Sequence, residues 1–265
     1  MALFRRKTRP VRVGNLTIGG DAPVLVQTMV KALPDDVEEI LRQVREAAEL
    51  GCELIRLAVP NEAALKPFAE VKRQSPLPLV ADIHFSHRLA LGAIEAGADK
   101  VRLNPGNLRD WEGIAEVVAA AKAKKIPLRI GVNSGSIRPR DQEPDPREMA
   151  ELLAEETLGY ARRIERDLGF GEMVLSLKAS EPSVTLAANR IAAKETDYPL
   201  HLGVTAAGPG EEALLKSAIG IGGLLAEGIG DAIRLSFTGS PASEVRAGKA
   251  LLRAAGLLRD RVEVV

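Results

Sequence analysis

The sequence has a single cysteine, and this scarcity excludes two kinds of structure. Cys52 is the only thiol among 265 residues. An intrachain disulfide requires two cysteines, and a thiolate-ligated metal cluster requires several. We therefore expect no disulfide, no metal site and no cofactor held by the cysteines of this chain.

The sequence also lacks a charge surplus and a long apolar run. Its 36 basic and 36 acidic residues give a formal net charge of zero. A nucleic-acid-binding protein normally carries a basic surplus, so no nucleic-acid partner is expected. No run approaches transmembrane length, and the N-terminus has no apolar stretch of signal-peptide length. These features, with a hydrophobic content of 46%, predict a soluble, cytoplasmic protein with a full core and no membrane partner.

The sequence does contain arginines inside apolar runs that are typical of buried parallel strands. A buried arginine is rarely without a partner, because an uncompensated buried charge costs several kcal/mol. Few carboxylates occupy comparable positions, and Asp82 is the clearest. We therefore predict that the cations face a wet cavity that receives a polyvalent anion such as a phosphate ester. The cations are Arg56 in residues 54–57, Arg102 in 100–103, Arg129 in 127–130, Arg234 in 232–235 and Lys178 at the end of 173–178.

Three of the arginine runs follow a recurring frame of a glutamate, a glycine and an acidic residue. The frame is typical of a helix end, a glycine cap, a short loop and a buried strand, which together form a βα repeat. Its members are Glu49, Gly51 and Glu53 before Arg56, Glu95, Gly97 and Asp99 before Arg102, and Glu227, Gly228 and Asp231 before Arg234.

Segmentation by this period predicts eight strands with helices between them. The strands fall near residues 23–28, 54–59, 78–83, 100–105, 127–133, 173–178, 199–205 and 232–237. Eight units favour a single (β/α)8 TIM barrel over residues 1–265, with an open doubly wound sheet as the competing arrangement. Apolar and polar residues alternate within residues 11–19 on both sides of a turn, which predicts an N-terminal β-hairpin that caps the barrel floor. Residues 134–144 form a long polar stretch of the kind that often serves as a lid.

Strand parity places the polar residues at one end of this barrel. Residues two or four apart on a strand share a face, and six polar pairs agree in this way at carboxyl ends, where barrel active sites are built. A single strand-end Asn or Asp more often caps the next helix, but six agreeing pairs favour a site. The glycine-rich loop 208–210 is a further candidate for phosphate binding. The pairs are Asp82 and His84, Arg102 and Asn104, Arg129 and Asn133, Lys178 and Ser180, His201 and Thr205, and Arg234 and Ser236.

Several of these segments together resemble the 4-hydroxy-3-methylbut-2-enyl diphosphate synthase family. The segments are residues 80–85, 102–107, 129–135, 201–205 and 216–220. The resemblance implies a barrel related to dihydropteroate synthase and reductive ring opening of 2-C-methyl-D-erythritol 2,4-cyclodiphosphate in isoprenoid biosynthesis. It also implies flavodoxin or ferredoxin as electron donor, a homodimer when full length, and a separate C-terminal domain that carries a 4Fe-4S cluster.

The resemblance assigns roles to individual residues. His84 and Asp82 would position or protonate the substrate, and the cations would stabilise the leaving diphosphate oxygen. The substrate-binding residues that it implies are Arg56, Arg102, Asn104, Arg129, Asn133, Lys178, Arg234 and Ser236.

Three departures from the family pattern qualify the prediction. Ala206 stands where the family has a glutamate. Near the first strand, Val30 and Ala32 do not match the family's residues. The family's cluster cysteines would follow Val265, so we expect the redox domain to be absent from this chain and the chain to be inactive in isolation. Two alternatives stay open. One is a barrel-only, catalytically impaired phosphoester-binding protein, and the other is a pterin- or phosphosugar-processing lyase or transferase.

Overall fold

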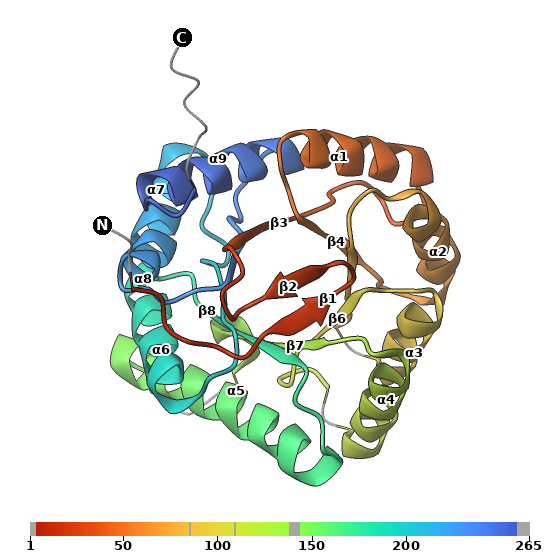
Figure 1. Cartoon of the computed structure of the whole chain (residues 1–265), viewed down its shortest axis with the longest axis horizontal. Helices are drawn as coiled ribbons and strands as arrows, with labels where there is room; N and C mark the ends of the chain where they lie inside the picture. The colour runs from red at the N-terminus through yellow and green to blue at the C-terminus, as the bar shows by residue number, and fades with distance from the viewer. Residues whose placement is uncertain (1–3, 85, 109, 138–143, 259–265) are drawn as a thin grey trace.

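Eight parallel strands form the centre of the protein. The computed structural model describes residues 4–84, 86–108, 110–137 and 144–258. Neighbouring strands pair in the order β8-β7-β6-β5-β4-β3-β10-β9, and a parallel bridge between Leu175 and Leu200 brings β8 and β9 together. The predicted barrel is therefore confirmed, and the open doubly wound sheet is wrong (Figure 1). The strands are β3 (Leu25–Met29), β4 (Leu54–Ala58), β5 (Leu79–Asp82), β6 (Lys100–Leu103), β7 (Leu128–Asn133), β8 (Met173–Lys178), β9 (His201–Leu202) and β10 (Ala232–Ile233).

The last two strands are shorter than the predicted residues 199–205 and 232–237. Beyond Leu202 and Ile233 the ladder gives way to single backbone hydrogen bonds. The N–H of Arg234 donates to Leu202 O at 3.0 Å, whereas that of Thr205 donates to Ala179 O at 3.0 Å. These two hydrogen bonds keep the segment after β10 beside β9 and the segment after β9 beside the end of β8 at the carboxyl end of the barrel.

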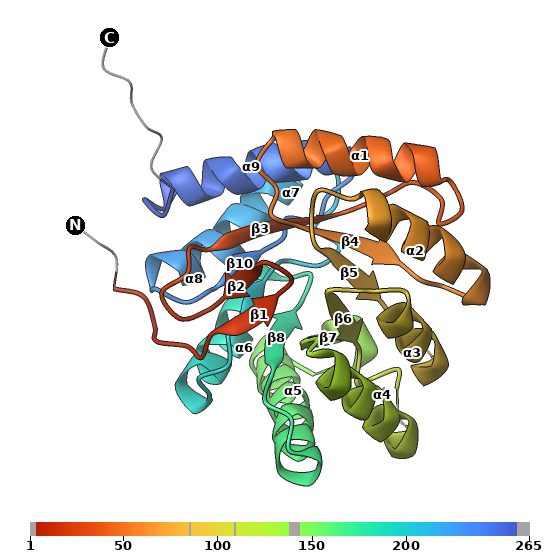
Figure 2. The same cartoon turned by 45° about the vertical axis from the view of Figure 1, so that its right-hand side comes forward.

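Helices surround the strands, and apolar side chains fill the space between them (Figure 2). Side chains cap the starts of two of these helices: Asp36 accepts a hydrogen bond from Glu39 N, and Asp145 accepts hydrogen bonds from Arg147 N and Glu148 N. The α-helices are α1 (Val37–Glu49), α2 (Leu65–Gln74), α3 (His87–Glu95), α4 (Trp111–Lys124), α5 (Pro146–Leu168), α6 (Pro182–Glu195), α7 (Gly210–Ser217), α8 (Gly223–Ala226) and α9 (Pro241–Ala254); shorter helical turns are η1 (Glu62–Ala64), η2 (Ser134–Ser136) and the π-helix η3 (Ala218–Gly222). None of the helices in the described part of the chain combines the length and apolar composition needed to cross a bilayer.

The acidic residue of the repeated frame has the same structural role in each unit. Glu53 accepts a hydrogen bond from Val26 N at 2.8 Å, Asp99 from Leu79 N at 2.7 Å, and Asp231 from Leu200 N at 2.9 Å. Each carboxylate therefore fixes the start of an adjacent strand. The glycine before it has a positive φ in all three units, as a helix C-terminal cap requires.

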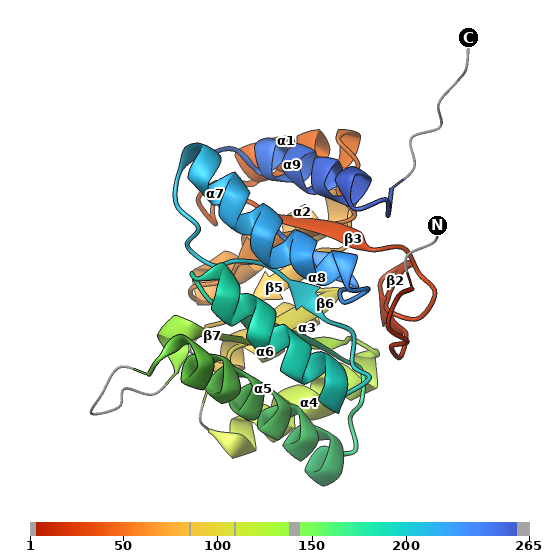
Figure 3. The same ribbon diagram turned by 90° about the vertical axis from the view of Figure 1, so that its left-hand side faces the viewer.

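The N-terminal hairpin closes one end of the barrel, as predicted. Strands β1 (Val11–Val13) and β2 (Leu16–Ile18) pair antiparallel, with Val11 opposite Ile18. Their apolar side chains form a cluster with the first inward-facing residues of the barrel strands, including Leu54 and Val174. Figure 3 shows the hairpin at one end and the starts of α5 and α7 at the other. The end opposite the hairpin is the carboxyl end, where the site must open.

Candidate functional site

A polar cavity of about 70 Å³ opens at the carboxyl end of the barrel. All five predicted cations contribute to it, which places residues from distant parts of the sequence around one space. Its lining residues are Arg56, Asp82, His84, Arg102, Arg129, Asn133, Ser176, Lys178, Val204, Thr205, Arg234 and Ser236.

Asp82 is the acidic centre of this cavity. Its carboxylate lies 3.7 Å from Arg56 Nε, 3.4 Å from Arg102 Nη1 and 3.1 Å from His84 Nε2. Burial alone would raise the pKa of Asp82, but Arg56, the hydrogen bond to His84 and Arg102 outweigh it and hold the pKa well below its usual range. Asp82 is therefore ionised at neutral pH and acts as a counter-ion. His84 is about half exposed and is better placed to exchange protons with solvent.

Arg129 lies in the cavity wall and forms no ion pair with a carboxylate among the described residues, although the charge of Asp82 favours its charged form. Its side chain is only 1% exposed, and its Nε has no hydrogen-bond partner among the described residues. Burial, and after it the charges of Arg56 and Arg102, lower the pKa of Arg129. Burial and Arg129 likewise lower the pKa of Lys178. A bound anion would relieve the repulsion among these cations.

Two glycines make room for the cations. A Cβ on Gly131 would lie 2.7 Å from Ser176 Oγ and 3.3 Å from Arg102 Nε, and one on Gly203 would lie 2.7 Å from Lys178 Nζ. Arg102 Nη2 also donates a hydrogen bond to Gly131 O at 3.1 Å. The glycines thus allow long basic side chains to pass close to the backbone inside the barrel.

Sequence reasoning missed Glu244, a carboxylate that reaches the site from outside the barrel. Glu244 lies on α9, is 1% exposed, and accepts hydrogen bonds from Thr28 Oγ1 at 2.7 Å and Arg234 Nη2 at 3.3 Å. Its Oε1 also lies 3.0 Å from Lys31 Nζ, and Lys31 donates to Phe237 O at 2.9 Å. Glu244 therefore joins the loops after β3 and β10. The one available signal was an acidic residue on the buried face of a helix.

Some predicted residues lie away from the cavity. Asn104 is buried, does not line the cavity, and accepts a hydrogen bond from Gly106 N at 3.2 Å, which is a turn-capping role. Ser180 is exposed, and His201 is fully buried below the site. The glycine loop 208–210 leads into α7 but is not among the lining residues. Within the predicted lid, residues 138–143 lie outside the described residues.

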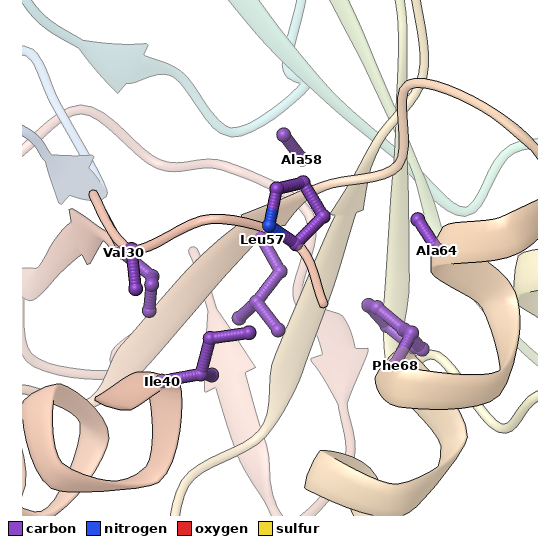
Figure 4. Close-up of a pocket in the computed structure, with 8 residues that line it drawn as sticks. Val30, Ile40, Leu57, Ala58, Ala64 and Phe68 are labelled. Atoms are coloured by element: carbon purple, nitrogen blue, oxygen red, sulfur yellow. The ribbon is translucent and has the colours of Figure 1, made fainter. Parts of the chain in front are cut away.

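The residues that depart from the family pattern occupy two different environments. Ala206 follows Thr205 at the edge of the cavity, is exposed, and has a φ of 48°. Val30 and Ala32 line a small apolar cavity of about 20 Å³ beside Ile40, Leu57 and Phe68 (Figure 4). The described residues that line this cavity all have apolar side chains, so none of these side chains can pair with an anion.

The described residues contain no cluster of His, Cys, Asp and Glu that could hold a metal ion. Cys52 is buried, and burial raises the pKa of its thiol to about 12, so it is protonated at neutral pH. These residues do not fit a 4Fe-4S cluster, which requires several thiolates. The side chains that line the polar cavity are of kinds that can bind an anion and exchange protons.

Comparison with known proteins identifies the family. The model of the GcpE TIM-barrel domain matches residues 8–249. The chain belongs to the GcpE family. A GcpE relative from Caldanaerobacter subterraneus subsp. tengcongensis is 48% identical over 265 residues, which are 100% of this chain and 74% of that protein. One from Geobacter sulfurreducens is 45% identical over 262 residues, or 99% of this chain and 74% of that protein. Both are named 4-hydroxy-3-methylbut-2-en-1-yl diphosphate synthase (flavodoxin), so the resemblance found in the sequence is confirmed.

Solved structures show that the GcpE barrel shares its fold with other enzymes. Dihydropteroate synthase of Burkholderia cenocepacia aligns with a TM-score of 0.65 at 16% identity, covering 95% of this chain and 99% of that one. 3-Dehydroquinate dehydratase of Geobacillus kaustophilus aligns with a TM-score of 0.62 at 19% identity, covering 95% and 99%. At such identities the likeness establishes the fold alone.

Proposed function

We propose that this chain is the substrate-binding barrel of a 4-hydroxy-3-methylbut-2-en-1-yl diphosphate synthase and that its cavity binds 2-C-methyl-D-erythritol 2,4-cyclodiphosphate. The observation that carries the proposal is the convergence of Arg56, Arg102, Arg129, Lys178 and Arg234 on one cavity. Only Asp82 and Glu244 offset these charges through contacts within the described residues. A ligand with two negative charges fits the surplus.

Each side chain has a role in this proposal. The arginines donate charge-assisted hydrogen bonds to the phosphate oxygens and stabilise the negative charge that develops on the leaving diphosphate oxygen. Asp82 keeps Arg56 and Arg102 oriented toward the cavity, and His84 exchanges a proton with the ligand or solvent. Asn133 and Ser236 contribute neutral hydrogen bonds from the cavity wall. Asn104 acts indirectly by holding the turn after β6.

Electron delivery lies outside this set of residues. We propose that a flavodoxin, which the relatives' names include, supplies electrons through a 4Fe-4S cluster that this chain does not ligate. In this account the chain alone binds substrate without reducing it, and the active enzyme is a cytoplasmic homodimer. A pterin-processing role has only the shared barrel fold in its favour.

Titration calorimetry tests the binding proposal. We expect the chain to bind the cyclic diphosphate at least tenfold more tightly than uncharged 2-C-methyl-D-erythritol. Arg102→Ala or Arg234→Ala should each cost about 1.5–3 kcal/mol, the range for a hydrogen bond to a charged group. Arg45→Ala on the exposed face of α1 is the matched control and should bind as wild type does. Equal binding of both ligands by the wild type would contradict the proposal.

A further inference from the structure

Three polar side chains below the cavity have no role in the anion site. Gln27, Lys100 and His201, together the polar layer, are at most 1% exposed. Neither amide atom of Gln27, nor Lys100 Nζ, nor either ring nitrogen of His201 has a hydrogen-bond partner among the described residues. By strand parity each of the three points into the barrel on the hairpin side of the cavity. Lys100, for example, lies two residues before Arg102 on β6, so it faces the same way but one step closer to the hairpin. A buried polar group without a partner is costly, so the layer requires an explanation.

Of the three side chains, Lys100 has the surroundings that least favour a charged form, because its neighbours are apolar side chains and other cations. Barrel interiors stack side chains from alternate strands, and the strands that alternate with β6 contribute Leu54, Val174 and Ala232 at this level, all members of the apolar cluster under the hairpin. The ionisable groups on the surrounding strands are Arg56 on β4, Asp82 on β5, Arg129 on β7, Lys178 on β8, His201 on β9 and Arg234 after β10.

The only carboxylate in that set already has partners. Asp82 contacts Arg56, Arg102 and His84. A charged Lys100 would therefore be an unpaired buried cation next to other cations. Burial, and after it the charges of Arg129 and Arg56, lower the pKa of Lys100 well below its ordinary 10.5.

We propose that Lys100 is a neutral amine in the free protein and takes up one proton when a dianionic ligand occupies the cavity. The inference rests on the proposed function, because the ligand's two negative charges offset the field of Arg129 and Arg56 that disfavours the ammonium form. Lys100 then adds a positive charge beneath the ligand only when the ligand is present. His201 does not compete for the proton at pH 8, because burial and Lys178 hold its pKa well below 6.5.

Calorimetry with 2-C-methyl-D-erythritol 2,4-cyclodiphosphate in two amine buffers of different ionisation enthalpy, both near pH 8, measures the proton uptake. Each phosphorus of this ligand bears one strongly acidic oxygen, so the ligand itself does not titrate there. We expect uptake of about one proton per ligand by the wild type, and an affinity that falls by up to about tenfold per pH unit as the pH rises. Lys100→Met should remove most of the uptake. His201→Gln and Lys124→Met, the latter on the exposed face of α4, should retain it.

Two results would overturn the inference. Binding by the wild type without proton uptake would show that no lysine changes state. Full uptake by Lys100→Met would assign the proton to Lys178, whose side chain lines the cavity. If Lys100→Met does not fold, Lys100→Gln replaces it with the same expected loss of uptake. Absence of any binding by the wild type would instead contradict the proposed function.

Discussion

Arg234 in the barrel and Glu244 on the surrounding helix α9 are joined by a hydrogen bond of 3.3 Å. Both side chains are almost fully buried, and burial lowers the pKa of Arg234 to about 10, so the guanidinium stays charged at neutral pH. A helix outside the barrel thus sets the orientation of a cation inside it. Because Glu244 also contacts Thr28 and Lys31, the loops after β3 and β10 are fixed to each other.

We expect Glu244→Gln to destabilise the protein by about 2–3 kcal/mol, because the amide loses charge-assisted bonds to two cations in a buried place. Chemical denaturation at pH 7 measures the change. Glu46→Gln, on the exposed face of α1 where Glu46 faces Arg42 at 3.5 Å, should change stability by no more than about 0.5 kcal/mol. Equal effects of the two substitutions would show that the Glu244 contacts contribute no more than a surface pair.

Gly203→Ala should disturb the site through sterics alone. The new Cβ would lie 2.7 Å from Lys178 Nζ and 2.8 Å from Arg234 O, which forces both to move. We expect a loss of about 1–3 kcal/mol in stability, typical of overpacking, together with weaker binding of the cyclic diphosphate.

Gly159→Ala is the matched control for that substitution. Gly159 lies within α5, and a Cβ there would meet no atom within 4 Å. Alanine should stabilise the helix by up to about 1 kcal/mol and leave binding unchanged. A destabilised Gly159→Ala, or a Gly203→Ala variant as stable as wild type, would show that the close approach at Gly203 is not what requires glycine.

The pH dependence of stability tests the resting state of Lys100. Because its pKa is lowered in the folded protein, the unfolded chain binds more protons between that lowered value and the ordinary 10.5. Stability therefore rises with pH across this window, by at most about 1.4 kcal/mol per pH unit for one group. Lys100→Met should lose this contribution, so its unfolding free energy should rise less than that of wild type between about pH 7 and about pH 9. Parallel curves for the two proteins would mean that Lys100 stays charged after folding.

The sequence predicted the barrel well because its signals are local. Each of these signals can be recognised from residues close together in the sequence. They are the apolar runs of strand length, the glycines at helix ends and the acidic residues at fixed offsets. Strand parity then placed Asp82, Arg102 and Arg129 among the residues at the carboxyl ends of the strands, and the structure brings them to one cavity. The same rule could not separate Asn104 from them, because a strand-end amide that caps its own turn has the same spacing as one that faces a ligand.

What the sequence could not reveal depends on contacts between distant segments. Glu244 reaches Thr28 across 216 positions, and no periodicity marks such a pair. Lys100 is the first residue of the apolar run that contains Arg102, and its sequence position resembles that of an exposed lysine at the start of a strand. The closure of the barrel nevertheless leaves it completely buried. The hydrogen bond from Thr205 N to Ala179 O likewise joins two units whose contact no local pattern marks.

The most direct test of the account is a crystal structure of this chain with 2-C-methyl-D-erythritol 2,4-cyclodiphosphate bound. We predict that the two phosphates lie in the cavity, within hydrogen-bond distance of Arg56, Arg102, Arg234 and Lys178, with Asp82 still paired to the arginines behind them. A ligand seated on the glycine loop 208–210, or anywhere else outside the ring of cations, would contradict the central claim that these strand-borne charges form the diphosphate site.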